Sequence, residues 1–169
     1  MSASQQLPDL QERQQAIQAD ASFIVQAPAG SGKTGLLIQR YLKLLSLVEH
    51  PEEVIAITFT RKAAAEMQAR ILTALESAGL KENAVDEYEM QTLELARDVL
   101  RQNQKQGWQL IENPGRLRVQ TIDSFCARLV RQMPLLSQIG GMQDIIEQPL
   151  PVYEQAAEAS LLELEAGDV

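Results

Sequence analysis

The pattern of apolar and polar residues divides the chain into short β-rich runs, each followed by a longer helix-like segment. The β-rich runs are SFIVQA at 22–27, EVIAITF at 53–59 and RLRVQT at 116–121. Each leads into a helix-like segment, and these segments begin near Lys33, Arg61 and Ile122. Strands that alternate with helices are typical of βαβ units, whose strands are parallel. The pattern therefore predicts an α/β fold in which a parallel sheet is flanked by helices.

The helix after the first run is apolar on much of its surface, which predicts that it packs on the sheet. In the second helix, apolar residues at steps of four and three predict a buried face, with Gly79 as a stop signal: Ala63, Met67, Ile71 and Ala74. Residues 80–86 are polar and are predicted to form a loop.

Two more helices are predicted further along the chain. One runs from about Glu87 to Gln104 and carries several apolar residues: Met90, Leu93, Leu95, Ala96 and Leu100. The other covers about 152–165, starting after Pro151 and ending before Gly167.

Composition limits the function classes. With 169 residues, the chain is long enough for one domain with a single core. The net charge of -8 comes from the end of the chain: residues 132–169 hold 7 acidic and no basic residues, whereas 15 basic and 16 acidic residues nearly cancel in 1–131. Composition alone thus gives no support for nucleic-acid binding.

Cysteine usage and hydropathy bear on location. The single cysteine, Cys126, excludes an internal disulfide, and one His with one Cys cannot form a zinc site of the usual kind. The N-terminus has no signal-peptide core, and no apolar run approaches the roughly 20 residues of a membrane span. We therefore expect a cytoplasmic protein without a membrane association or a structural metal.

The most informative motif is the loop after the first β-rich run. Residues 27–34, APAGSGKT, match a Walker A phosphate loop directly after a predicted strand and at the start of a helix, with Ala27 where the general pattern has Gly. Gly30 and Gly32 allow positive φ, so that backbone N–H groups can approach phosphate oxygens. Lys33 is predicted to reach the β- and γ-phosphates and the Thr34 hydroxyl to ligate Mg²⁺. We expect the whole loop to bind ATP: Ala27, Pro28, Ala29, Gly30, Ser31, Gly32, Lys33 and Thr34.

Three segments together resemble motifs I, Ia and Ib of the superfamily 1 UvrD/Rep helicases. They are APAGSGKT, IAITFTRKAAAEMQARI at 55–71 and VQTIDSFCARLVRQM at 119–133. TIDSFC is closer to the RecB/AddA branch, the motor subunits of helicase–nuclease complexes. The resemblance covers about residues 9–135 and implies a RecA-like motor domain. It also implies an ATP-dependent DNA helicase that acts in recombination or repair, whose partners are the remaining motor domains and a helicase–nuclease subunit.

The ends of the second and third strands are the expected nucleic-acid site. In an open parallel sheet, ligands lie beyond the carboxyl ends of the strands. Hydroxyls, cations and one aromatic ring follow these strands, a set suited to a phosphate backbone and a base. The resemblance implies that they bind single-stranded DNA: Thr58, Phe59, Thr60, Arg61, Thr121 and Ser124. Residue by residue, Thr60 is equally explained as a helix cap, Phe59 as core, and Arg128 and Arg131 as a solvated helix face.

Upstream, the family uses a Gln to read the adenine edge. The segment DLQERQQAIQ supplies Gln11, Gln14 and Gln15, and we favour Gln14, although alignment on AI places Arg13 there. A solvated Gln on an amphipathic helix is the alternative. Arg40 is either near the nucleotide or a surface charge.

Some expected parts of a motor are not recognised in the sequence. A motor of this family needs an acidic pair after a later strand, arginine fingers and a second motor domain. Asp86 and Glu87 follow a polar segment between the second and third motifs, so we reject them as that pair. We expect 1–141 to be the first part of a motor domain and 142–169 the start of an inserted helical subdomain, and we expect this chain alone to be inactive. The alternatives are a stand-alone non-catalytic nucleotide-binding module and another P-loop enzyme.

Overall fold

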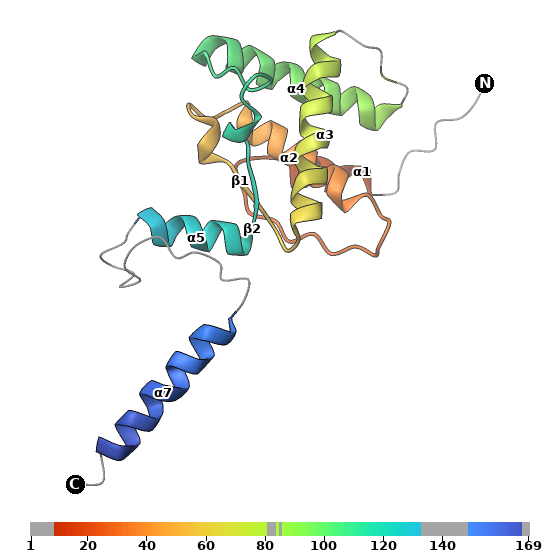
Figure 1. Ribbon diagram of the computed structural model, residues 1–169. Coiled ribbons are helices and arrows are strands. Elements are labelled where there is room, and N and C mark those ends of the chain that lie inside the picture. The colour runs from red at the N-terminus through yellow and green to blue at the C-terminus, as the bar shows by residue number, and fades with distance from the viewer. Residues whose placement is uncertain (1–8, 81–83, 85, 133–148, 167–169) are drawn as a thin grey trace. The chain divides into compact units, whose positions relative to one another are not determined.

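The computed structural model describes residues 9–80, 84, 86–132 and 149–166 (Figure 1). The chain divides into two compact units, Met1–Ala127 and Arg128–Val169. The first unit contains the phosphate loop and the ends of both strands. The domain boundary predicted at residue 141 lies outside the described residues.

A parallel pair of strands forms the sheet of the first unit. Strand β1, Ile55–Thr58, pairs with β2, Arg118–Thr121, so that Ile55 lies opposite Arg118 and Thr58 opposite Thr121. This confirms parallel pairing of the second and third β-rich runs. Side chains alternate between the two faces of a strand. Ala56 and Val119 pack against the core, whereas Ile55 and Ile57 are exposed on the other face.

The first β-rich run, 22–27, is extended but is not a strand, so the prediction of a third strand is wrong for the described chain. A strand needs a neighbour for its backbone N–H and C=O groups. Within the part of the chain that the structure describes, residues 22–26 form no backbone hydrogen bond. Their apolar side chains are also exposed, Ile24 to 99% and Phe23 and Val25 to 40% each.

Helices α2, α3 and α4 begin where their start signals predict. Helix α2, Lys33–Leu45, starts after Gly32, and α3, Arg61–Gly79, starts after Thr60 and ends at the predicted glycine. Helix α4, Glu87–Gln106, starts after Asp86, and its C-cap is Gly107 in the left-handed conformation. A short helix, α1, Leu10–Ile17, precedes the phosphate loop.

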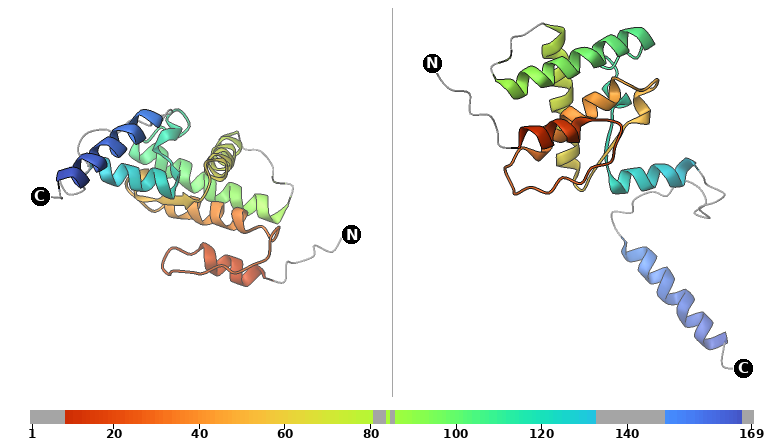
Figure 2. Two further views of the ribbon diagram at one scale, coloured as in Figure 1. Left: turned by 60° about the horizontal axis from the view of Figure 1, so that its bottom comes forward. Right: turned by 180° about the vertical axis from the view of Figure 1, so that it is seen from behind.

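One core joins the helices and the sheet of the first unit. Helix α3 packs on both strands, α4 packs across α2 and α3, and α1 lies alongside α2 (Figures 1 and 2). The largest side chains without solvent exposure come from α2, α3, α4 and the segment before β2: Leu42, Leu45, Ile71, Leu75, Val99 and Leu110. Burial of such side chains is the main source of stability, at about 25 cal/mol per Å² of apolar surface. The phosphate loop thus leads directly into α2, a helix whose buried face packs in this core.

One predicted core position is wrong. In the first turn of α3 the buried alanine is Ala64, whereas Ala63 is exposed. At about 100° per residue, Ala63 lies about 80° around the helix from Ile71, at the edge of the buried face, while Ala64 lies about 20° from it. In α4, Met90 is 52% exposed because it sits in the first turn, ahead of the buried Leu93 and Ala96.

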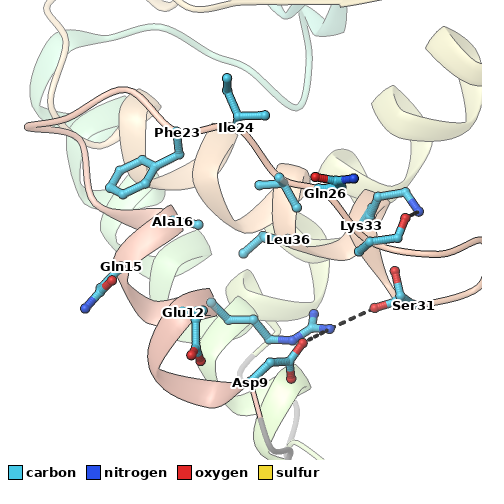
Figure 3. Close-up of a pocket in the computed structure, with 13 residues that line it drawn as sticks. Asp9, Glu12, Gln15, Ala16, Phe23, Ile24, Gln26, Ser31, Lys33 and Leu36 are labelled. Atoms are coloured by element: carbon cyan, nitrogen blue, oxygen red, sulfur yellow. Dashed lines mark hydrogen bonds and ion pairs between the residues drawn. The ribbon is translucent and has the colours of Figure 1, made fainter.

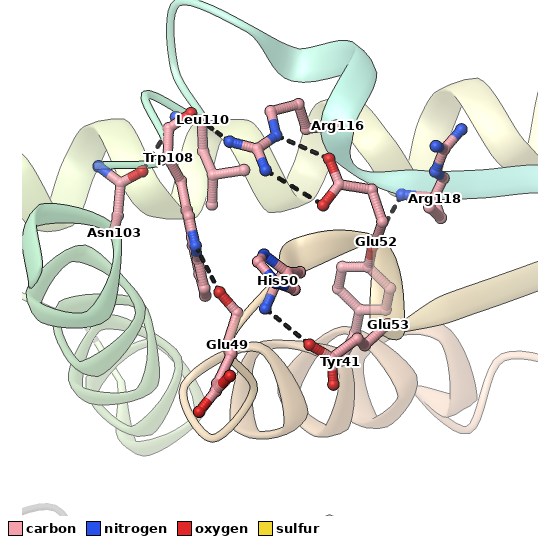
Figure 4. Close-up of polar contacts among 10 residues, drawn as sticks. All are labelled: Tyr41, Glu49, His50, Glu52, Glu53, Asn103, Trp108, Leu110, Arg116 and Arg118. Carbon is pink, nitrogen blue, oxygen red and sulfur yellow. Dashed lines mark hydrogen bonds and ion pairs between the residues drawn. The ribbon is translucent and has the colours of Figure 1, made fainter. Parts of the chain in front are cut away.

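A polar network ties the segment before β2 to the turn before β1 (Figure 4). The Arg116 guanidinium donates to both carboxylate oxygens of Glu52, at 2.7 and 3.1 Å, and its Nη1 donates to the Trp108 carbonyl at 3.0 Å. The Trp108 indole Nε1 donates to the carbonyl of Glu49 at 2.9 Å. Tyr41 joins the residue before β1 to the first residue of β2, since its hydroxyl accepts from the Arg118 N–H and donates to the Val54 carbonyl. Burial raises the pKa of Tyr41 to about 12.

We expect the Glu52–Arg116 pair to make stability depend on acid pH. The hydrogen bond from Arg116 lowers the pKa of Glu52. A carboxyl whose pKa is lower in the folded chain stabilises it above the unfolded pKa of about 4.3, and that contribution is lost as pH falls through the folded pKa. In urea unfolding at pH 7, Glu52→Gln should lose about 1 kcal/mol, because the pair is partly exposed.

The difference between Glu52→Gln and the unsubstituted chain should shrink as the pH is lowered through about 4. Glu112→Gln, which changes an exposed glutamate, is the control and should leave the free energy of unfolding unchanged. A constant difference at every pH would show that the carboxylate charge of Glu52 does not contribute.

The second unit contains α7, Leu150–Ala166, whose predicted range was about 152–165. It begins before Pro151, which lies in the first turn, where a proline is tolerated. Helix α5, Ile122–Gln132, crosses the division between the units. In the described residues, no helix is both long enough and apolar enough to cross a membrane.

Candidate functional site

The phosphate loop has the backbone conformation that its glycines predict. Gly30 has φ 77° and Gly32 has φ 81°, and both lie in the left-handed region that side chains disfavour. Gly32 is the N-cap of α2, and its carbonyl accepts from the N–H of Leu36 at 3.1 Å. The loop therefore ends directly on a helix N-terminus, where free N–H groups and the helix dipole favour an anion.

Lys33 is folded over the loop. Its Nζ donates to the carbonyls of Ala27, at 2.6 Å, and Pro28. The ammonium is therefore held at the loop by neutral oxygens that a bound phosphate could replace with charged ones. Thr34, the next residue of α2, is exposed, so its hydroxyl is accessible to a metal ion at the loop.

A cavity of about 420 Å³ lies beside the loop, between α1, residues 23–27 and the start of α2 (Figure 3). The side towards the loop is polar and includes Ser31 and Lys33, whereas Phe23, Ile24 and Leu36 are apolar. Ligand sites of this size combine an apolar lining with a few polar groups. The cavity has room for a nucleoside next to the phosphate loop.

Arg13 of α1 reaches the loop. Its Nη2 donates to the Ser31 carbonyl at 2.8 Å and contacts the Asp9 carboxylate at 2.9 Å. The hydrogen bond from Arg13 lowers the pKa of Asp9, and the same bond raises the pKa of Arg13. Arg13 Nε and Ser31 Oγ are both buried without a hydrogen-bond partner. Unpartnered buried polar atoms are uncommon in folded proteins, and these two lie at the contact between α1 and the loop.

Gln14 and Arg40, the other predicted nucleotide contacts, form no hydrogen bond with the phosphate loop in the described chain. Gln14 is exposed and lines a different hollow with Lys43 and Leu95, whereas Arg13 and Gln15 line the cavity beside the loop. Gln14 lies about 100° around the helix from Arg13, the residue that contacts the loop. Arg40 donates to the carbonyls of Ala16, Gln18 and Ala21 and lies 5.2 Å from the Phe23 ring centre.

A contact between Arg13 and the loop was not predicted from the sequence. Alignment on AI was the signal that could have singled Arg13 out, because that alignment places it where the family has its adenine-reading residue. Arg40, in contrast, fixes the chain between α1 and the loop through backbone carbonyls, which no sequence pattern indicates.

The predicted nucleic-acid residues gather at the carboxyl ends of the two strands, because β1 and β2 are parallel and in register there. Phe59 is 88% exposed, so its interpretation as core is wrong. Thr60 caps α3 by accepting from the Ala63 N–H at 3.1 Å, and Arg61 follows it, exposed, in the first turn. Thr58 donates its hydroxyl to the Thr60 carbonyl.

Thr121 is buried, and its hydroxyl accepts from the Ser124 N–H at 3.2 Å and lies 2.9 Å from the Ser124 hydroxyl. Its side chain thus serves the start of α5, while Ser124 is exposed. Of the predicted residues at this edge, Thr121 is therefore buried, whereas Phe59, Thr60, Arg61 and Ser124 are exposed.

Carboxylates near the loop are few. Of the described residues, Glu12 of α1 and Asp9, its N-cap, are the only carboxylates that line the cavity, and Asp9 is paired with Arg13. Asp86 accepts from the Glu89 N–H at 2.7 Å and caps α4, which explains its position without a catalytic role. No group of three His, Cys, Asp or Glu side chains suited to a metal occurs in the described part of the chain.

The residues present fit a nucleoside triphosphate. The left-handed glycines, the helix N-terminus and Lys33 suit the phosphates, and the cavity beside them, which has both apolar and polar lining, suits a nucleoside. Thr34 would hold Mg²⁺ through its hydroxyl, and the metal would neutralise charge on the phosphates.

Comparisons with known proteins agree on one family. The UvrD/REP helicase N-terminal domain matches residues 9–164. The chain is 34% identical over 122 residues to an ATP-dependent helicase/nuclease subunit of Lactobacillus acidophilus, covering 72% of this chain and 9% of that protein. It is 35% identical over 125 residues to the protein of the same name in Desulfitobacterium hafniense, covering 71% of this chain and 8% of that protein. No solved structure matches the chain.

Proposed function

Because the chain belongs to the UvrD/REP helicase N-terminal domain family, we propose that it forms the ATP-binding part of the first motor domain of a DNA helicase. The observation that carries the proposal is the phosphate loop with two left-handed glycines, joined to α2 at Lys33. The adjoining cavity and the two unpartnered polar atoms, Arg13 Nε and Ser31 Oγ, support a nucleotide there.

Each loop residue has a defined task in this proposal. Backbone N–H groups of Gly30–Thr34 bind phosphate oxygens, and Lys33 exchanges the Ala27 and Pro28 carbonyls for the β- and γ-phosphates. Thr34 holds Mg²⁺. ATP supplies the phosphoryl bond whose hydrolysis drives a motor. The isolated chain should hydrolyse it slowly, because the pocket carboxylates of the described chain, Asp9 and Glu12, are not the acidic pair that positions water.

Single-stranded DNA is the proposed second ligand, bound at the edge formed by the ends of β1 and β2. Phe59 offers an exposed ring for stacking on a base, and Arg61 and Lys62 offer cations for phosphates. The N-terminus of α3 faces the same edge and favours a phosphate. The strands and the phosphate-loop helix share one hydrophobic core, so the two proposed ligand sites belong to the same packed unit.

The parent protein is proposed by analogy with its relatives. The matched region spans 7–9% of the length of the relatives compared, so most of such a protein is not represented here. We propose a cytoplasmic enzyme of DNA recombination or repair, with further motor domains and a helicase–nuclease partner.

Calorimetric titration of the chain with Mg-ATP, with and without a single-stranded oligonucleotide, tests the proposal. Binding of ATP with little turnover is the expected result. Absence of ATP binding would contradict the function. An ATP affinity that is the same with and without the oligonucleotide would favour a non-catalytic nucleotide module. Rapid ATP turnover without DNA would favour another P-loop enzyme.

Phe59→Ala should weaken binding of a single-stranded oligonucleotide by about 1–3 kcal/mol, roughly 5- to 150-fold, because a stacked base loses its platform. Fluorescence anisotropy with a labelled oligonucleotide measures the change. Leu80→Ala, which removes another exposed apolar side chain at the far end of α3, should leave DNA affinity unchanged. A lower melting temperature with unaltered DNA affinity in Phe59→Ala would contradict the stacking role.

A further inference from the structure

Arg13 joins the helix before the phosphate loop to the loop itself. It lies on α1, 18 residues before Ser31, and its Nη2 is 2.8 Å from the Ser31 carbonyl. A Cβ placed on Gly32 would lie 3.5 Å from Arg13 Nη1, so the guanidinium also lies against the next residue of the loop. The contact thus falls on the peptide unit between Ser31 and Gly32.

The carbonyl of Ser31 and the N–H of Gly32 belong to this one peptide unit. A trans peptide is planar, and its C=O and N–H point in opposite directions. A donor that holds the Ser31 carbonyl towards α1 therefore holds the Gly32 N–H away from α1. Gly32 has a left-handed φ and is the N-cap of α2, where successive N–H groups form a concave anion site.

Asp9 keeps Arg13 in this position. Asp9 is the N-cap of α1, yet its carboxylate makes no capping hydrogen bond. It lies 2.9 Å from Arg13 Nη2 instead. Side chains at an N-cap usually accept from the helix N–H groups, so this carboxylate has a different partner from the usual one. A planar guanidinium can contact a carboxylate and a carbonyl together, which a lysine ammonium does less well.

We propose that Arg13, held by Asp9, is a positioning residue that orients the Ser31–Gly32 peptide so that the Gly32 N–H is pre-set for a phosphate. This inference rests on the proposed nucleotide function and adds to it a residue outside the phosphate-loop motif. Pre-organised donors favour binding because less ordering is needed when the ligand arrives. The role concerns the phosphates alone and is independent of the base.

The test compares binding of Mg-ATP and of magnesium tripolyphosphate, which has no base, to the unsubstituted chain and to Arg13→Ala. Loss of one oriented hydrogen bond should weaken both ligands equally, by about 5- to 15-fold. Arg13→Lys should show an intermediate loss. Arg101→Ala, which removes an exposed arginine from α4, is the matched control and should change neither affinity.

The amide resonance of Gly32 in the ¹⁵N-labelled chain gives a readout that a general loss of stability would not move. It should broaden or shift in Arg13→Ala at an unchanged melting temperature, and it should stay as in the unsubstituted chain in Arg101→Ala. Unchanged affinities in Arg13→Ala, or a loss for ATP alone, would overturn the positioning role. Failure of the unsubstituted chain to bind either ligand would overturn the proposed nucleotide function, and this role with it.

Discussion

Lys33→Ala is expected to bind Mg-ATP about 100-fold more weakly than the unsubstituted chain, a loss of roughly 3 kcal/mol. The Lys33 ammonium is the cation of the phosphate loop, and charge-assisted hydrogen bonds to phosphate are about twice as strong as neutral ones. The fold should persist, because Lys33 contacts only loop carbonyls and its side chain takes no part in the core. Calorimetric titration gives the affinity, and a thermal melt gives the stability.

Lys43→Ala is the matched control for this experiment. Lys43 lies in the last turn of the same helix and lines a different hollow, so its removal changes the net charge equally without touching the loop. ATP affinity should be unaltered in that variant. Equal affinities in Lys33→Ala and the unsubstituted chain would contradict the phosphate-loop assignment.

Trp108→Ala is expected to destabilise the fold by about 3–5 kcal/mol, the usual cost of removing a buried aromatic side chain. Trp108 is 3% exposed and belongs to the core, and its indole N–H donates to the Glu49 carbonyl. Since domains are stable by about 5–15 kcal/mol, this variant should be close to unfolding. Circular dichroism in urea is the measurement, because Trp108 is the sole tryptophan and its fluorescence disappears with it.

Trp108→Phe separates the two contributions of the side chain. It keeps an aromatic ring in the core but leaves the Glu49 carbonyl without its donor, which should cost about 1–3 kcal/mol. The backbone contacts of residue 108, to Asn103 and Arg116, are present in both variants. Equal losses in the two variants would show that the hydrogen bond, rather than the packing, is the main contribution.

Local signals predicted the helix starts because each start is determined within a few residues. Thr60 accepts from the Ala63 N–H, the Thr121 hydroxyl accepts from the Ser124 N–H, and Gly32 adopts the left-handed conformation. Each hydrogen bond joins residues three positions apart, and the glycine conformation involves one residue. A short sequence pattern therefore includes every residue that takes part. The same reasoning explains why the loop conformation could be predicted from GSGKT alone.

Non-local partners account for what the sequence did not predict. The run 22–27 has a strand composition, but a strand also requires a neighbour, and the described chain provides none. Arg13 contacts Ser31 only because α1 packs beside α2 and turns that side of the helix towards the loop. Its neighbour Gln14 was a reasonable choice by residue type, yet the direction of each side chain depends on that packing.

The unpaired segment 22–26 also has a consequence for nucleotide affinity. Its backbone N–H groups form no hydrogen bond in the described chain, so they should exchange with solvent deuterium much faster than those of β1. Residues 23–26 line the cavity beside the loop, and a ligand there that fixed their backbone would meet a cost of about 1–2 kcal/mol of conformational entropy per residue. A neighbouring strand that paired with residues 22–26 would already order their backbone, so that ligand binding would no longer include this entropy loss. Nucleotide affinity would then rise without a new contact to the nucleotide.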